Sequence, residues 1–101
     1  MSTSSTSPQS EEKEELLLEP QPITNLRERH PSTTIDYTVR HLSGEPHIII
    51  IASHPTYKSI IARQESGGFE VQTPDGEIEF EQTKQDALTT AVDSISYQIH
   101  N

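Results

Sequence analysis

The longest apolar run of the chain is 47–53 (HIIIIAS), near its middle. Successive side chains of a strand point to opposite faces, so Ile48 and Ile50 share one face while Ile49 and Ile51 share the other. Large β-branched residues on both faces are typical of a central strand buried on two sides. The run is too short to cross a membrane, because a spanning helix needs about 20 apolar residues. We therefore expect 47–53 to be the central strand of a sheet.

Further strands are indicated on both sides of this run. Apolar and polar residues alternate strictly in 35–41 (IDYTVRH), which predicts a strand with three inward-facing residues, Ile35, Tyr37 and Val39. Between this strand and the central run, 42–46 (LSGEP) has the composition of a hairpin turn. Segment 57–64 has helical spacing but β-branched composition, and we assign it as a strand.

Two later segments, 69–73 (FEVQT) and 77–81 (EIEFE), alternate around the turn sequence Pro74-Asp75-Gly76. Proline sets the first turn angle and glycine accepts a positive φ, so the pattern predicts a hairpin. We expect its apolar residues to face the core together: Phe69, Val71, Ile78 and Phe80. The remaining residues would then point into water: Glu70, Gln72, Glu77, Glu79 and Glu81.

Two helices are predicted, one before and one after the strands in the sequence. The first lies in 22–31 and places Ile23 and Leu26 on one face. The second runs from Thr83 or Lys84 to Ile99, with Thr83 as cap, and carries an apolar stripe of Leu88, Ala91, Val92, Ile95 and Ile99. The predicted fold class is α+β: an antiparallel sheet of four or five strands, a C-terminal amphipathic helix packed on one face and a short N-terminal helix.

The N-terminal residues differ in composition from the rest. Residues 1–10 are mostly Ser, Thr, Pro and Gln, and an acidic stretch follows up to Glu19. We expect 1–21 to be a disordered acidic tail, with a marginal helix within 10–19, and 22–101 to form a single small domain. The leucines 16–18 fit either a docking motif or an acidic linker, and the linker interpretation is favoured.

The charge balance narrows the classes of partner. Sixteen acidic and seven basic residues give a net charge of −9. Such a field opposes binding to nucleic acid and to anionic lipid, and favours a basic protein surface as partner. The absence of cysteine removes disulfides, thiolate zinc sites and cysteine nucleophiles, and fits a reducing cytoplasm. The polar start of the chain has no secretory pattern, so we expect a cytoplasmic protein without membrane contact.

No motif identifies a reaction, a cofactor or a metal. His41 and His47 could lie nearly opposite each other in the first hairpin, but spacing supplies no third ligand, because His54 would be about 20 Å from His47. We therefore interpret them as surface histidines. No serine has the strand-turn-helix setting of a nucleophile, and Gly67-Gly68 lacks the context of a phosphate loop. The expectation is a protein that is not an enzyme.

The order of the predicted elements resembles that of double-stranded-RNA-binding domains. It consists of a short helix, three or more strands and a last helix that begins at 83–88 (TKQDAL). The resemblance implies lysines at the start of that helix that grip phosphates across a groove. Here Lys84 is the only lysine in 83–88, and Asp86 lies beside it.

The strongest functional signal is the second face of the central strand. One C-terminal helix covers one sheet face, so the other isoleucine pair needs cover from the segment around Ile23 and Leu26, from a second copy or from a partner. We predict a small acidic protein-binding module, regulatory or adaptor-like, with these binding candidates: Ile49, Ile51, Tyr57, Ile60, Ile61, Glu77, Glu79 and Glu81. This module could also form a homodimer through the same face. The alternatives are an acidic protein whose glutamate row mimics nucleic acid and, less favoured by the charge balance, a double-stranded-RNA-binding-like domain.

Overall fold

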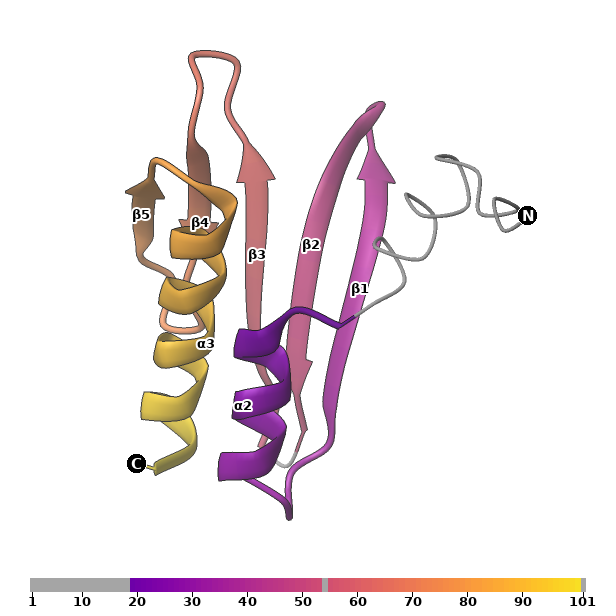
Figure 1. The fold of residues 1–101 in the computed structure, drawn as a ribbon, viewed down its shortest axis with the longest axis vertical. Helices are drawn as coiled ribbons and strands as arrows, with labels where there is room; N and C mark the ends of the chain where they lie inside the picture. Colours follow the sequence, from indigo (N-terminus) through magenta and orange to yellow (C-terminus); the bar gives the residue numbers. More distant parts are fainter. Residues whose placement is uncertain (1–18, 54, 101) are drawn as a thin grey trace, which may run out of the picture.

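The computed structural model describes residues 19–53 and 55–100 of the chain. The elements follow in the order α2 (Gln21–Arg29), β1 (Ile35–Leu42), β2 (Glu45–Ala52), β3 (Tyr57–Arg63), β4 (Phe69–Gln72), β5 (Ile78–Glu81) and α3 (Lys84–His100). The strands form one five-stranded sheet in the order β1-β2-β3-β4-β5, and every neighbouring pair is antiparallel. Both helices lie side by side on the same face of the sheet (Figure 1). The predicted α+β fold is confirmed.

Several expectations concern residues that the structure does not describe. The tail up to residue 18, its leucines 16–18 and His54 lie outside the described residues. The predicted first helix is confirmed and begins at Gln21. Segment 57–64, whose pattern was mixed, is a strand.

The core is the layer between the sheet and the two helices. In β2, Ile48, Ile50 and Ala52 are buried on the helix side, whereas Ile49 and Ile51 lie on the other side of the sheet. Ile61 pairs with Ile48 across β2–β3 and extends this row. Together the strands and both helices form one cluster: Ile23, Leu26, Ile35, Ile48, Ile50, Ala52, Ile61, Val71, Ala87, Leu88, Ala91, Val92 and Ile95.

The long helix α3 begins where the capping pattern predicts. The Thr83 hydroxyl accepts a hydrogen bond from the Asp86 N–H at 3.0 Å, which satisfies one of the free donors of the first turn. The apolar stripe of α3 then packs on β3, β4 and α2. The expected helix and its cap are confirmed.

In the described part of the chain, strand β1 is covered near its start and exposed farther along. Ile35 is 2% exposed, Tyr37 is half-buried and Val39 is 43% exposed, although all three point to the helix side as predicted. Burial declines along the strand because α2 contacts the sheet beside the first residues of β1. The far half of β1 therefore projects beyond the helix layer (Figure 1).

The orientation of β5 differs from the prediction. Val71 lies opposite Glu79, and Gln72 lies opposite Ile78. Directly opposed residues of an antiparallel pair share a face, so Glu79 is on the helix side and Ile78 is on the other side. Accordingly, Ile78 is 46% and Phe80 is 68% exposed. The expectation that Ile78 and Phe80 face the core was wrong.

The length of the connection causes this inversion. The Thr73 N–H donates to the Glu77 carbonyl at 2.9 Å, and three residues, 74–76, lie between them. An odd-numbered loop brings together positions of the same parity, whereas a common apolar face for Val71 and Ile78 requires an even-numbered loop. The turn was predicted at the right place, but its residue count decides which face of β5 is buried.

The first hairpin is also tighter than expected. Its loop is Ser43-Gly44, with Leu42 opposite Glu45, and both loop residues have positive φ, 54° and 81°. Positive φ at both central positions is the geometry of a type I′ turn. The strand β2 therefore begins at Glu45, and His47 lies opposite Arg40 rather than His41.

Candidate binding surface

The side of the sheet opposite the helices, here called the open face, carries a group of apolar side chains. Ile49 of β2 lies directly opposite Ile60 of β3, with Ile51 and Ala62 beside them. The edge strand β5 adds Ile78 and Phe80, which the register places opposite Gln72 and Glu70 of β4. The apolar side chains of the open face thus lie on three of the five strands, with Gln72 and Glu70 of β4 between those of β3 and those of β5.

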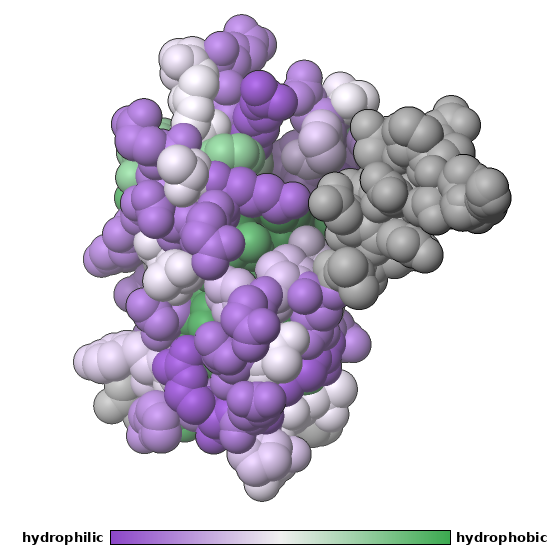
Figure 2. All heavy atoms as spheres, in the orientation of Figure 1, coloured by the Kyte–Doolittle hydropathy of each residue, from purple (hydrophilic) through white to green (hydrophobic). Residues whose placement is uncertain are grey.

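No helix among the described residues covers the open face. Helix α2 packs against α3 and the start of β1, on the same side of the sheet as α3, so Ile23 and Leu26 do not cover the second isoleucine pair. The helix side of the molecule is largely hydrophilic toward solvent (Figure 2). Apolar residues grouped on a sheet surface that the described helices leave uncovered are typical of an interface.

A hollow of about 550 Å³ adjoins this apolar group at one end of the open face. Ala62 lies in its floor next to His47, which it opposes across β2–β3. Three carboxylates line it, those of Glu45, Glu65 and Glu70, together with Arg63. The excess of negative charge in the hollow fits a basic side chain next to an apolar surface.

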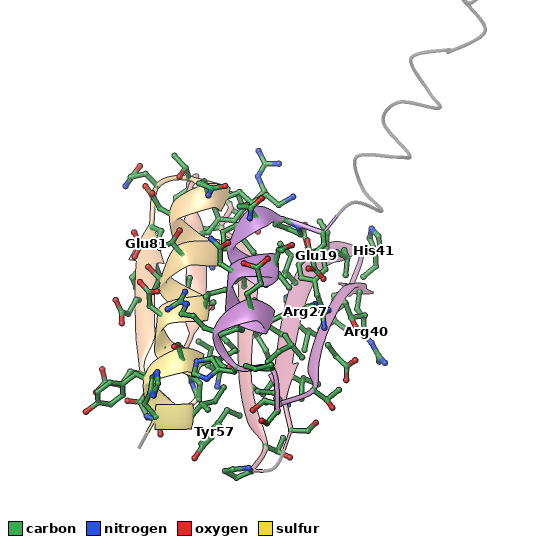
Figure 3. The ribbon with its side chains drawn as sticks, turned by 60° about the horizontal axis from the view of Figure 1, so that its bottom comes forward. Glu19, Arg27, Arg40, His41, Tyr57 and Glu81 are labelled. Carbon is green, nitrogen blue, oxygen red and sulfur yellow. The ribbon has the colours of Figure 1, made fainter. Side chains whose placement is uncertain are left out.

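The structure brings together part of the predicted binding set. Ile49, Ile51 and Ile60 share the open face. Ile61 lies on the helix side and is 1% exposed, and Tyr57 packs against the core opposite Ala52 (Figure 3). Neighbouring residues of one strand face opposite sides, so Ile60 and Ile61 cannot both belong to one surface.

The predicted glutamate row lies on the helix side of β5. The Glu81 carboxylate accepts a hydrogen bond from the Thr90 hydroxyl of α3 at 2.6 Å (Figure 3). Glu77 and Glu79 line a cleft of about 260 Å³ between β5 and α3, with Asp93 on its other wall. The three glutamates therefore share one side of β5, but this is the opposite side of the sheet from Ile49, Ile51 and Ile60.

Sequence reasoning missed Ala62, Ile78 and Phe80 as members of the open face. For Ile78 and Phe80 the usable signal was the odd number of residues in the turn 74–76. Ala62 follows from simple alternation with Ile60, two residues earlier in β3.

The histidines do not form the arrangement that the first hairpin suggested. His41 lies opposite Pro46 on the helix side, while His47 lies on the open face. Within 19–53 and 55–100, no three or more His, Asp or Glu side chains are grouped so that they could hold a metal ion. The two histidines therefore do not converge on a common ligand.

His30 connects the two helices. It is 7% exposed, and its Nε2 forms a 2.8 Å hydrogen bond with the Ser96 hydroxyl of α3. The His100 ring meets it edge-on, with centroids 4.9 Å apart. Burial, then the charges of His100 and Arg29, lower the pKa of His30 below its ordinary value. The folded environment therefore disfavours protonation of His30.

Comparison with protein-family models, with curated proteins and with solved structures gave no match. In the described part of the chain, no helix has the length and apolar character needed to span a membrane. Five strands lie between the two helices, and Lys84 is the only lysine in α3. The resemblance to double-stranded-RNA-binding domains is thus one of element order.

Proposed function

We propose that this chain is a small, non-enzymatic, cytoplasmic protein-binding module that docks a partner protein on the open face of its sheet. The observation that carries the proposal is the group of apolar side chains on that face, which the described helices leave uncovered. Its members are Ile49, Ile51, Ile60, Ala62, Ile78 and Phe80.

The expected energy of docking comes from the solvent-exposed part of these side chains. Phe80 is 68% exposed and Ile78 is 46% exposed, so both can lose most of their water contact to a partner. Full burial of one such side chain contributes about 1.5–3 kcal/mol. Ile49 and Ile60 lie in the middle strands, where a partner would exclude water most completely.

The hollow beside this group indicates the chemistry of the partner. A lysine or arginine that follows an apolar segment of the partner would meet the carboxylates of Glu45, Glu65 and Glu70 while the apolar segment covers Ala62 and Phe80. Such a pair near the rim adds selectivity for a basic partner more than it adds affinity. The proposed partner is therefore an apolar protein surface with basic side chains at its border.

The test begins with a photo-activatable residue placed at Phe80 in the full chain, expressed in the source cells. A matched probe at Thr89, exposed on α3, reports contacts of the helix side. The proposal expects a cross-linked partner at position 80 that is absent at position 89. A probe at Phe80 that captures nothing, or the same proteins as the probe at Thr89, would overturn the proposal.

The captured partner is then purified and titrated with two variants that change the net charge equally. Ile49→Asp places a carboxylate in the middle of the open face and is expected to weaken binding about 30-fold or more, since central interface residues contribute 2 kcal/mol or more. Thr89→Asp is expected to leave binding unchanged. Equal effects of the two substitutions would show that charge, and not the open face, governs the association.

The nucleic-acid-mimic alternative has one supporting observation. Glu77, Glu79 and Asp93 face one cleft, so their negative charge is concentrated on the helix side. A double substitution of Glu77 and Glu79 to Gln should then abolish competition with nucleic acid for a basic partner. The double variant Glu28→Gln, Asp86→Asn carries the same change of net charge and should retain it. If both double variants compete as the wild type does, this alternative is excluded.

A further inference from the structure

The strand β1 forms one edge of the sheet over eight residues, whereas the other edge strand, β5, has four. Among the described residues, no strand pairs with the outer side of β1. Arg27 protects only its beginning: the guanidinium donates to the Ile35 carbonyl and forms a 2.8 Å ion pair with Glu19 (Figure 3). A long edge with unpaired backbone groups is a template for another strand.

The backbone hydrogen bonds show which residues of β1 point outward. The Ser53 N–H donates to the Thr34 carbonyl at 3.0 Å, and these two residues continue the β1–β2 register by one position. In an antiparallel ladder, alternate residues bond to the neighbour on one side. Even-numbered residues of β1 thus bond to β2, and odd-numbered ones, such as Tyr37 and Val39, present N–H and C=O to the free edge.

Arg27 provides a second observation of the same parity. Its guanidinium donates to the carbonyl of Ile35, so the carbonyl of this odd-numbered residue is bonded by a side chain of α2. Among the described residues, no strand pairs with the outward groups of Tyr37 and Val39, which lie beyond this protected end.

The charges of β1 favour one way of pairing this edge with itself. Asp36 and Arg40 both lie on the open-face side, four residues apart, with Thr38 midway between them. In an antiparallel pairing of two copies of β1, the odd-numbered residues of both copies must form the hydrogen bonds. One copy can therefore slide along the other only in steps of two residues. Centring the pairing on Thr38 places Asp36 opposite Arg40 of the second copy, and two-fold symmetry makes this contact twice.

The other permitted registers are less favourable. A shift that centres the pairing on Arg40 places the two arginines opposite each other, and centring on Asp36 opposes the two aspartates. The intermediate shifts leave both charges opposite uncharged residues. In the register centred on Thr38, Tyr37 also lies opposite Val39 of the second copy on the helix side. There the 43% exposed Val39 gains an aromatic neighbour.

We infer that two copies of this chain associate through β1 as an antiparallel edge-to-edge dimer, with Thr38 on the two-fold axis and Asp36 of each copy opposite Arg40 of the other. The backbone groups of Tyr37 and Val39 form the central hydrogen bonds. The two sheets become one ten-stranded sheet, with all helices on one side and the two open faces joined on the other. The dimer uses no side chain of the apolar group on the open face, so it is independent of the proposed function.

The first test is the mass of the full chain in solution by sedimentation equilibrium, up to about 1 mM. It is made in about 0.15 M salt, because the net charge of −9 on each copy causes repulsion that this salt screens beyond about 8 Å. A concentration-dependent rise from 11.3 kDa toward twice that mass is expected. A mass of 11.3 kDa throughout would overturn the inference.

Charge reversal tests the register. Asp36→Arg makes each copy two units less negative, so general repulsion falls and a non-specific association would strengthen. The proposed register instead creates two like-charge contacts, and we expect the dissociation constant to rise about tenfold or more. Arg40→Asp should weaken the dimer as well. Lys58→Asp, two strands away in the same row as Asp36, makes the same charge change as Arg40→Asp; it is the control for that variant and should have a much smaller effect.

Mixing the two reversed variants provides the decisive measurement. Asp36→Arg chains opposed to Arg40→Asp chains restore an attractive contact at both positions, so native mass spectrometry should show the mixed dimer in excess over either self-dimer. A statistical mixture of the three dimers would overturn the register.

A single introduced thiol gives a geometric check, because the chain contains no cysteine. Opposed residues of a non-hydrogen-bonded pair have Cα atoms about 4.5 Å apart, within the range of a disulfide. Thr38→Cys is therefore expected to form a covalent dimer with oxidised glutathione, whereas Val39→Cys is not self-opposed and should remain uncoupled. Efficient coupling of Val39→Cys instead would show that the copies pair in a different register.

Discussion

Two adjacent residues of β2, Ile49 and Ile50, allow the burial of the two sheet faces to be compared directly. We consider Ile→Thr at each position, because threonine keeps the β-branched shape and leaves strand propensity nearly unchanged. Ile50 is 0% exposed beneath the helices, whereas Ile49 is partly exposed on the open face. Any difference between the two variants therefore reports the environment of the side chain.

The expected cost at Ile50 follows from two contributions. The substitution removes two carbon atoms from the core, which costs about 1.6 kcal/mol at about 0.8 kcal/mol each. It also buries a hydroxyl among apolar neighbours, which costs about 1–3 kcal/mol without a full hydrogen bond. The sum is about 3–5 kcal/mol, a large part of the roughly 4–12 kcal/mol expected for about 80 residues. At Ile49 the hydroxyl stays in water, and we expect less than about 1 kcal/mol.

Urea unfolding followed by far-ultraviolet circular dichroism measures both costs. With a slope of about 1 kcal/mol/M, Ile50→Thr should lower the midpoint by about 3–5 M and Ile49→Thr by less than about 1 M. The measurements are made at two protein concentrations to separate folding from association.

Equal destabilisation at both positions would refute the reasoning, since it would mean that Ile49 is covered in the folded monomer as completely as Ile50. A cost at Ile49 that grows with protein concentration would instead show that a second copy covers the open face. In both cases the open face would not be available to the proposed partner.

Three further predictions concern single positions away from the open face. Gly68→Ala should cost about 2 kcal/mol or more of unfolding free energy, because its φ is +79° and an added Cβ would lie 2.8 Å from the carbonyl oxygen of Glu81 at the end of β5. Gly67→Ala, with φ +98° and open space around it, should cost only about 1 kcal/mol. Equal urea midpoints for the two variants would contradict the close approach at Gly68. Burial above all holds the pKa of His30 below its ordinary value, so its contribution to stability is complete above about pH 6.5 and is lost as the pH falls through the lower folded pKa. Between pH 8 and pH 5.5, the unfolding free energy of the wild type should therefore fall more than that of His30→Gln, which keeps a donor toward Ser96. An equal fall in both proteins would show that His30 does not cause the pH dependence. Thr83→Ala removes the cap of α3 and should cost about 1 kcal/mol, whereas Thr83→Ser should cost little; a thermal melt in which all three proteins agree would show that the cap contributes nothing.

The element types of the described chain could be predicted because each carries a local signal. The alternation in 35–41 indicates β1, the capping pattern at Thr83 marks the start of α3, and the stripe that follows indicates its buried face. Each of these signals involves only a few neighbouring residues, so it can be read from the sequence without knowledge of the tertiary structure.

Pairings that depend on loop length were not predictable in the same way. A change of one residue in the loop 74–76 would exchange the faces of β5, and this count places Phe80 in solvent and Glu81 against Thr90. The two-residue loop Ser43-Gly44 separates His41 from His47 by the same principle. A shift of one residue turns every side chain of the strand to the other face, because side-chain direction repeats every two residues. The pattern within the strand is the same in both cases, so it does not show which face is buried.

By itself, the sequence determined that this protein is an α+β domain with a central isoleucine strand and an amphipathic last helix, because these properties follow from local periodicity and capping. The tertiary structure decided that both described helices cover the same face of the sheet, that neither of them covers the face bearing Ile49 and Ile60, and that β1 is an edge. Those outcomes depend on which surfaces meet across the whole chain. Only the folded arrangement can decide them, because each apolar face could be covered by any other that the connections allow it to reach.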